Sequence, residues 1–227
     1  MRLHNFFVRD KLEGTQSITI TDSDLLHQWS KVFRLGKGDR VVLLDNSGFE
    51  FECVFTLLTK KEASLSIEEK RENTSIPGRQ VHMYLAVLKK DNFELVLQKG
   101  TELGVTHFHP ILTSRTEKQN INVERAEKIV REASEQSGRG TMPTIVPILT
   151  LGEVLDTDNE YIALHMDGEK FDSQKFTEDV SVLVGPEGGW SDEEIALFKE
   201  KNIPIYSLGN TTLRAETAAI AISTLLY

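Results

Sequence analysis

The spacing of apolar residues changes near residue 75, which divides the chain into two parts. In the first part, short runs rich in β-branched and aromatic residues span 41–44, 49–58 and 63–67. Turn residues separate these runs, so they predict paired β-strands. One amphipathic helix is predicted before them, because apolar residues follow the polar stretch 21–24 at helical spacing: Leu25, Leu26, Trp29, Val32 and Phe33. The first 70 or so residues are therefore expected to form a small, mostly β domain.

The second part alternates strand and helix patterns. Strands are predicted at 81–88, 108–112, 161–164, 181–184 and 204–208, and helices at 93–103, 123–137, 192–201 and from about 213 onward. This alternation predicts a parallel sheet covered by helices on both faces. The charged stretch 68–78 ends in Pro77-Gly78, which is typical of a linker. We therefore expect two domains, 1–72 and 73–227.

Charge is distributed unevenly along the chain. The 227 residues carry a formal net charge of −9, which excludes a uniformly basic nucleic-acid-binding protein. Residues 141–227 hold 15 acidic and 5 basic residues, whereas residues 76–140 hold 8 acidic and 10 basic ones. A polyanionic partner could dock on the first 140 residues, although the same distribution also fits an acidic protein with ordinary local variation.

The single cysteine, Cys53, excludes an internal disulfide and a metal site built from several thiolates. No apolar run reaches the ~18 residues that a membrane helix needs. Both observations favour a cytoplasmic protein that does not enter a membrane. His107 and His109 alternate around Phe108, but no third ligand accompanies them, so we expect no metal.

Two glycine-containing turns each follow a predicted strand and precede a predicted helix. The first is Gly185-Pro186-Glu187-Gly188-Gly189, and the second runs from Leu208-Gly209 to Leu213-Arg214-Ala215-Glu216. Open α/β sheets bind ligands at the carboxyl ends of their strands, and glycines let the backbone approach a ligand closely. Neither turn has the spacing of a Walker or dinucleotide-binding loop. The first could also serve only to start a helix, because Ser191 and Glu194 make a capping box.

These two turns, in this order, resemble the trefoil-knotted SPOUT methyltransferases, specifically the RsmE type. Earlier segments fit the same pattern: Lys99-Gly100-Thr101-Glu102-Leu103-Gly104, Ser114-Arg115 and residues 132–139. The N-terminal part resembles that family's PUA-like RNA-binding domain, with His4-Asn5-Phe6-Phe7-Val8 at its start. The resemblance implies an α/β fold: a C-terminal trefoil-knot (SPOUT) domain with a parallel sheet, preceded by a small β-rich PUA-like barrel domain.

The resemblance also implies methylation of N3 of one uridine in 16S ribosomal RNA of the small subunit, with S-adenosyl-L-methionine as cofactor. The residues implied to bind the cofactor are Leu164, His165, Val184, Gly185, Pro186, Gly188, Gly189, Leu208, Gly209, Asn210, Leu213 and Thr217. Those expected to contact RNA are Arg2, Arg9, Arg34, Lys37, Arg115, Gln136 and Arg139. The resemblance also implies a homodimer, and we expect one because the last helix has an apolar surface broader than one sheet would cover.

Uridine N3 keeps its proton at neutral pH, so its methylation requires a base or an environment that stabilises the anion. We expect Arg214 to stabilise this anion, because a cation at the start of a helix is otherwise unfavourable. Glu216 or Glu187 would be the base or would orient Arg214, and for Glu187 we favour orientation. Cys53 is expected to be a small core residue rather than a nucleophile.

Two other functions fit the same residues. The first is a non-catalytic RNA-binding ribosome-assembly factor that keeps the knot as a scaffold. The second is an enzyme of another kind that binds a different nucleotide at the glycine turns. Binding of S-adenosylmethionine, as against ATP or NAD, would distinguish them.

Overall fold

The computed structural model describes residues 3–227, and their contacts divide them into two compact units. One unit comprises the residues up to Ile76 together with Ser134–Thr141, and the other comprises Pro77–Ala133 and Met142–Tyr227. The sequence pattern did not indicate that the short segment 134–141 would group with the first unit. The boundary between residues 72 and 73 stays a prediction.

The first unit is built on a five-stranded sheet with the order β1-β3-β4-β5-β2. Its strands are β1 (Asn5–Phe7), β2 (Ser17–Ile20), β3 (Arg40–Leu44), β4 (Phe49–Leu58) and β5 (Ala63–Glu72). The predicted helix is present in two pieces, because α1 (Ser23–His27) continues directly into a π-helical turn, η1 (Gln28–Val32). Trp29 of this turn is fully buried and packs edge-on against Phe6 and Phe55, so the helix closes over the core of the sheet.

Part of the predicted linker is strand instead. β5 continues through Glu72 and pairs with β4 as far as Phe49. The Arg71 Nε atom lies 2.6 Å from Glu50 Oε2, and the Lys70 ammonium lies 3.9 Å from the centre of the Phe49 ring. These cross-strand partners stabilise charged residues on an exposed strand, which a charge-rich composition alone does not reveal.

The second unit contains a parallel sheet with the order β12-β10-β11-β6-β7-β8, and β9 also pairs with β7. The strands are β6 (Val81–Ala86), β7 (His107–Leu112), β8 (Thr144–Ile145), β9 (Leu149–Thr150), β10 (Ile162–Lys170), β11 (Val180–Val184) and β12 (Ile205–Ser207). All of their pairings are parallel. β8 and β9, two residues each, are too short to show a period in the sequence.

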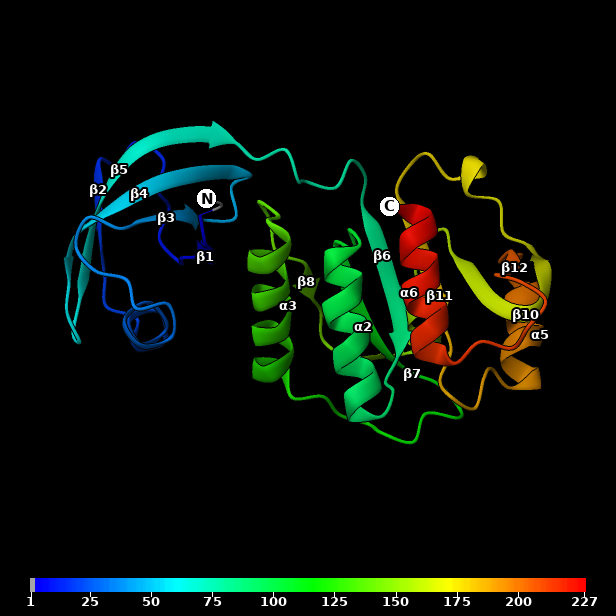
Figure 1. The fold of residues 1–227 in the computed structure, drawn as a ribbon. Helices are drawn as coiled ribbons and strands as arrows, with labels where there is room; N and C mark the ends of the chain where they lie inside the picture. Colours follow the sequence, from blue (N-terminus) through cyan, green and yellow to red (C-terminus); the bar gives the residue numbers. More distant parts are fainter. Residues whose placement is uncertain (1–2) are drawn as a thin grey trace. The chain divides into compact units, whose positions relative to one another are not determined.

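Helices cover both faces of this sheet, as predicted. α2 (Lys90–Glu102), α3 (Val123–Ser137) and α6 (Ala215–Leu226) pack on one face, around Met83 and Phe108. α4 (Leu151–Leu155) and α5 (Asp192–Glu200) pack on the other, around Tyr84 and Leu183. A short 3₁₀ turn, η2 (Ser173–Lys175), lies between β10 and β11. Figure 1 shows α3, α2 and α6 side by side, each beginning at the end of the sheet where β6 stops. Among residues 3–227, no helix has the length and apolar character needed to cross a membrane.

Candidate active site

A cavity of about 330 Å³ opens at the carboxyl ends of β11 and β12, beside the middle of β10. This volume lies in the range typical of small-molecule sites. The segments 164–166, 184–190 and 206–209 supply most of the lining, and the stretch 211–213 completes it together with Arg115, Ala215 and Ala218. Both glycine turns therefore reach one cavity, at the edge of the sheet where the sequence placed a ligand.

The first turn is held in place by Trp190. Its indole Nε1 donates a hydrogen bond of 2.9 Å to the Leu164 carbonyl, across to the neighbouring strand β10. A Cβ atom on Gly185 would lie 3.0 Å from the Trp190 ring, so a side chain at this position would push against that ring. Gly189 has a φ of +67°, a left-handed conformation that favours glycine. The predicted capping box at Ser191 and Glu194 is confirmed, and it fixes the turn to the start of α5.

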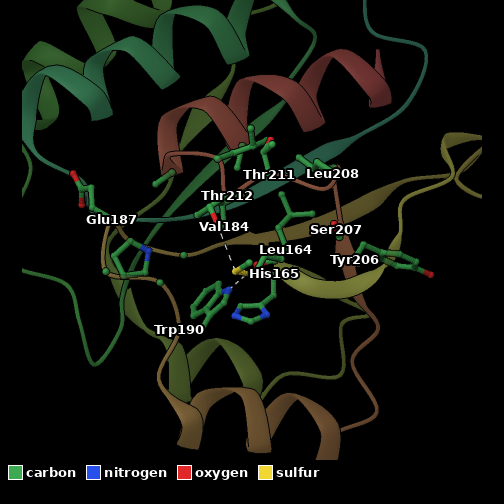
Figure 2. A pocket seen from close by; sticks show the side chains of 18 of the residues that line it. Leu164, His165, Val184, Glu187, Trp190, Tyr206, Ser207, Leu208, Thr211 and Thr212 are labelled. Carbon is green, nitrogen blue, oxygen red and sulfur yellow. Dashed lines mark hydrogen bonds between the residues drawn. The ribbon is translucent and has the colours of Figure 1, made fainter.

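The second turn closes the opposite side of the cavity. In Figure 2, Leu208, Thr211 and Thr212 lie on one side and His165 and Trp190 on the other. The Thr212 hydroxyl lies 3.7 Å from the Met166 sulfur, which links this turn to β10. The two turns therefore enclose a space that is bounded mainly by backbone, glycines and apolar side chains.

All of the predicted cofactor-binding residues except Asn210 and Thr217 line this cavity. Those two belong to the same turn and to the first helical turn after it, but they lie outside the lining. Eight further residues line the cavity that were not expected from the sequence: Met166, Trp190, Tyr206, Ser207, Thr211, Thr212, Ala215 and Ala218. Met166 was missed because β10 was expected to end at Leu164, whereas it continues to Lys170. The other seven lie beside positions that the two glycine motifs singled out, and this proximity in the sequence was the available signal.

Glu187 lies at the rim of the cavity and turns away from it. Figure 2 shows its carboxylate directed away from His165 and Trp190. Its Oε1 accepts a hydrogen bond of 2.9 Å from the backbone N–H of Lys89, the N-cap residue of α2. The carboxylate thus joins the first glycine turn to the positive end of a helix. This contact is made with Lys89 and not with Arg214, so orientation of Arg214 by Glu187 stays a prediction.

Neither Arg214 nor Glu216 lines the cavity, but each directly follows a lining residue in the chain, Leu213 and Ala215 respectively. The Arg214 side chain is 87% exposed, whereas that of Glu216 is only 10% exposed. Arg214 Nη1 lies 4.0 Å from Glu216 Oε1, and within residues 3–227 the other oxygen, Oε2, has no hydrogen-bond partner. The Glu216 carboxylate is therefore buried, whereas the neighbouring Arg214 guanidinium is exposed and can contact a ligand.

The predicted RNA-binding residues fall in both units. Arg115 lines the cavity, and its Nη1 donates to the carbonyls of Gly188 and Trp190 at 2.9 and 3.0 Å, so it braces the first turn. The exposed residues Arg9, Arg34, Lys37 and Gln136 belong to the first unit, as does Arg139. Arg139 is only 4% exposed, and its Nε donates to the Thr141 carbonyl, which gives it a structural contact that a surface arginine would lack. Arg2 lies outside the described residues.

Cys53 is buried in the first unit, as predicted. Burial raises the pKa of its thiol to about 12, so it stays protonated and cannot act as a nucleophile at neutral pH. Among residues 3–227, no group of three or more histidine, cysteine or acidic side chains is placed to hold a metal ion.

A family model described as the RNA methyltransferase domain matches residues 75–227, two thirds of the chain and all of the cavity. The chain belongs to this family. A second model, described as the RNA methyltransferase PUA domain, matches residues 31–68. The family assignment thus rests on both parts of the chain.

Relatives of the family resemble the chain over nearly its whole length. The ribosomal RNA small subunit methyltransferase E of Rickettsia conorii is 29% identical over 97% of this chain and 93% of its own. The protein of the same name from Synechocystis is 35% identical over 89% of this chain and 70% of its own. A crystal structure of ribosomal RNA small subunit methyltransferase E from Neisseria gonorrhoeae, bound to S-adenosyl methionine, superposes with a TM-score of 0.89 at 26% identity, covering 98% of this chain and 95% of that one.

A putative methyltransferase from Legionella pneumophila, in complex with the cofactor SAM, also has a TM-score of 0.89, at 27% identity, and covers 100% of this chain and 97% of its own. These matches confirm the predicted RsmE-type resemblance. They also confirm the fold class, a SPOUT α/β domain with a parallel sheet that follows a small PUA-like β domain.

Proposed function

We propose that this protein methylates small-subunit ribosomal RNA with S-adenosylmethionine, at N3 of a uridine. The observation that carries the proposal is the cavity between the two glycine turns, because structures of the same fold are described with this cofactor bound. The substrate RNA is inferred from the relatives, which are named as methyltransferases of small-subunit ribosomal RNA. The cytosol, where that RNA is found, is then the compartment.

The residues present fit the cofactor. Gly185 and Gly189 leave the backbone of the first turn uncovered, and an adenine ring can lie against the apolar lining formed by Leu164, Val184 and Leu208. When bound, S-adenosylmethionine supplies a methyl group on a sulfonium. The main-chain groups of these strands and of Leu213 would hold it, and no protein nucleophile is needed for an in-line displacement.

The uridine-N3 specificity rests on Arg214 and Glu216. Removing the N3 proton leaves a negative charge, and the exposed guanidinium of Arg214, which directly follows the lining residue Leu213, can stabilise it. Glu216 would orient Arg214 from below, or would accept the proton at its free Oε2. Glu187 has a positioning role, because its carboxylate binds the backbone at the start of α2.

The decisive experiment compares ribosomal RNA from cells with and without the gene and maps its modified uridines. In vitro, the purified protein should bind S-adenosylmethionine and transfer its methyl group to small-subunit RNA.

Arg214→Ala should keep cofactor affinity and lower kcat at least tenfold, an effect of about 1.4 kcal/mol on the transition state.

The control variant is Arg131→Ala, which removes a cation on α3 that neither lines the cavity nor neighbours a lining residue in the chain. Binding of the cofactor and RNA without methyl transfer would instead establish the non-catalytic assembly factor. Binding of ATP or NAD in its place would favour an enzyme of another kind.

A further inference from the structure

A second cavity, of about 190 Å³, lies between the first turns of α2 and α3. Its floor is apolar and buried, and consists of Leu88, Phe93, Leu97 and Ala126. Its rim carries three cations, Lys90, Lys118 and Arg125, and a single carboxylate, Glu94. This lining is positive although the whole chain has a net charge of −9.

The one carboxylate does not neutralise the rim. Glu94 forms an ion pair with Arg125, with 3.0 Å between Oε2 and Nη2, and its Oε1 lies 3.9 Å from the Lys90 ammonium. Lys118 has no hydrogen bond or ion pair with any other residue of the described chain. The helices α2 and α3 both begin here and add the positive ends of their dipoles. A negatively charged ligand with an apolar part fits such a lining best.

This cavity is connected to the candidate active site by two short segments. Glu187, at the rim of the first cavity, binds the N–H of Lys89, which directly precedes Lys90 of the second. Arg115 lines the first cavity and Lys118 the second, and three residues of chain span at most about 11 Å. A single RNA strand could therefore occupy both cavities with neighbouring nucleotides.

We propose that the second cavity binds a nucleotide next to the target uridine in the substrate RNA, an inference that rests on the proposed function. The base lies on the apolar floor against Phe93, and the phosphate lies among Lys118, Lys90 and Arg125. Asn120, whose amide is at the exposed rim, offers hydrogen bonds to the edge of the base. Unstacked bases in RNA are commonly bound in this way, by an aromatic face and polar groups.

The phosphate contact is tested with Lys118→Ala, measured by RNA affinity as a function of salt. Each phosphate contact to a single strand contributes about 0.7 to the slope of log K against log salt, so the slope should decrease by about 0.7. Lys128→Ala is the matched control, because Lys128 is an exposed lysine of α3 outside the cavity, 62% exposed and 4.0 Å from Glu132. It should leave the slope unchanged.

A second pair of variants places a carboxylate at or beside the rim. Asn120→Glu should weaken RNA binding at least fivefold through repulsion of the phosphate. Gln119→Glu changes the net charge equally at the adjacent exposed position, which is outside the cavity, and should have less than a twofold effect.

Phe93→Leu tests the base contact. It should weaken RNA binding about fivefold or more, since base stacking on an aromatic ring is worth about 1–3 kcal/mol. Because Phe93 is only 5% exposed, its thermal unfolding is measured alongside. If this variant does not fold, the two rim variants still decide the proposal.

Cofactor affinity is measured for every variant and should not change. If the wild-type protein methylates RNA while Lys118→Ala and Asn120→Glu match it in RNA affinity and salt slope, the second cavity does not bind RNA and the proposed function stands. If these variants lose cofactor affinity instead, the cavity belongs to the cofactor site and the proposal is wrong. A wild-type protein that transfers no methyl group to RNA contradicts the proposed function itself.

Discussion

At the scale of single residues, Gly189 combines a left-handed backbone with an open cavity. Its φ is +67°, and a Cβ added to it would meet no atom within 4 Å of the protein itself. A side chain there is strained by its own backbone and also enters the space assigned to the cofactor. Gly189→Val should therefore abolish measurable binding of S-adenosylmethionine in a titration.

Gly14→Val is the matched control for this prediction. Gly14 has a φ of +76° and equally open surroundings, but it lies in the first unit. Valine there imposes a similar backbone strain and should leave cofactor affinity unchanged. Equal affinity of the Gly189 variant and the wild type would show that the first turn does not hold the cofactor.

The residue scale also shows how far the sequence could identify the site. Glycine turns after buried strands located the cavity, because a turn motif is local and its position after a strand is visible in the apolar pattern. Whether a given side chain of the turn faces inward depends on the path of the chain between strands. For that reason Thr211 was missed, and Asn210, which is expected to bind the cofactor, lies outside the lining.

At the scale of elements, β10 lies very close to the backbone of β12 at Gly168. A Cβ atom at this position would lie 2.6 Å from the Ile205 carbonyl oxygen, which is backbone and cannot move aside. The pairing of strand β10 with strand β12 shifts in register between Leu164 and Glu169, and Gly168 lies within this irregular stretch. Only the first residues of β10, up to Leu164, were predicted as strand from the sequence, because the later residues of β10 are largely polar and exposed.

Gly168→Ala should consequently lower the free energy of unfolding by about 1–3 kcal/mol, the usual effect of overpacking. Gly152→Ala in α4 provides the comparison, because the nearest atom to its Cβ would be 4.0 Å away and alanine favours a helix by up to about 1 kcal/mol. Denaturant unfolding of both variants measures the difference. A Gly168 variant as stable as the wild type would contradict the close approach.

Neighbouring strands β6 and β7 also bring three histidines together. The His82 Nδ1 and His109 Nε2 atoms are 3.0 Å apart, and the His82 and His107 rings are stacked with centres 4.2 Å apart. Burial lowers the pKa of all three, as does the positive charge of neighbouring histidines for His107 and His109, and the pKa of His109 falls to about 4. Asp179 opposes this effect at His82 and His107.

Because the unfolded chain binds these protons near pH 6.5 and the folded chain does not, stability is lost as the pH falls from about 6.5 towards 4. The stabilisation is fully present above about pH 7. We expect unfolding free energy to fall by about 2 kcal/mol between pH 7 and pH 5, since solvent reaches part of the cluster. His109→Gln should reduce this fall, whereas His27→Gln, an exposed histidine of α1, should not. An identical pH dependence in the two variants would count against the cluster.

At the scale of the whole molecule, the surface of the second unit around α2 and α6 carries exposed apolar side chains. Leu95 is 39% exposed, Leu225 is 44% exposed and Tyr227 is 79% exposed. The two helices lie side by side in Figure 1, and the Tyr227 ring is close enough to Gly104, just after α2, that a Cβ there would clash at 2.7 Å. Monomeric proteins rarely leave such surfaces open, so we propose that this face pairs with a second copy of the chain.

Light scattering at micromolar concentration should then give about twice the chain mass of 25.6 kDa. Leu225→Glu places a charge in the shared apolar surface and should shift the mass to that of a single chain, because burying an unpaired carboxylate is strongly unfavourable. Leu57→Glu, at an equally exposed leucine of β4 that is 41% exposed, should leave the mass at twice the chain value. A wild-type mass of one chain, or a dimer that survives Leu225→Glu, would show that α6 does not form the interface.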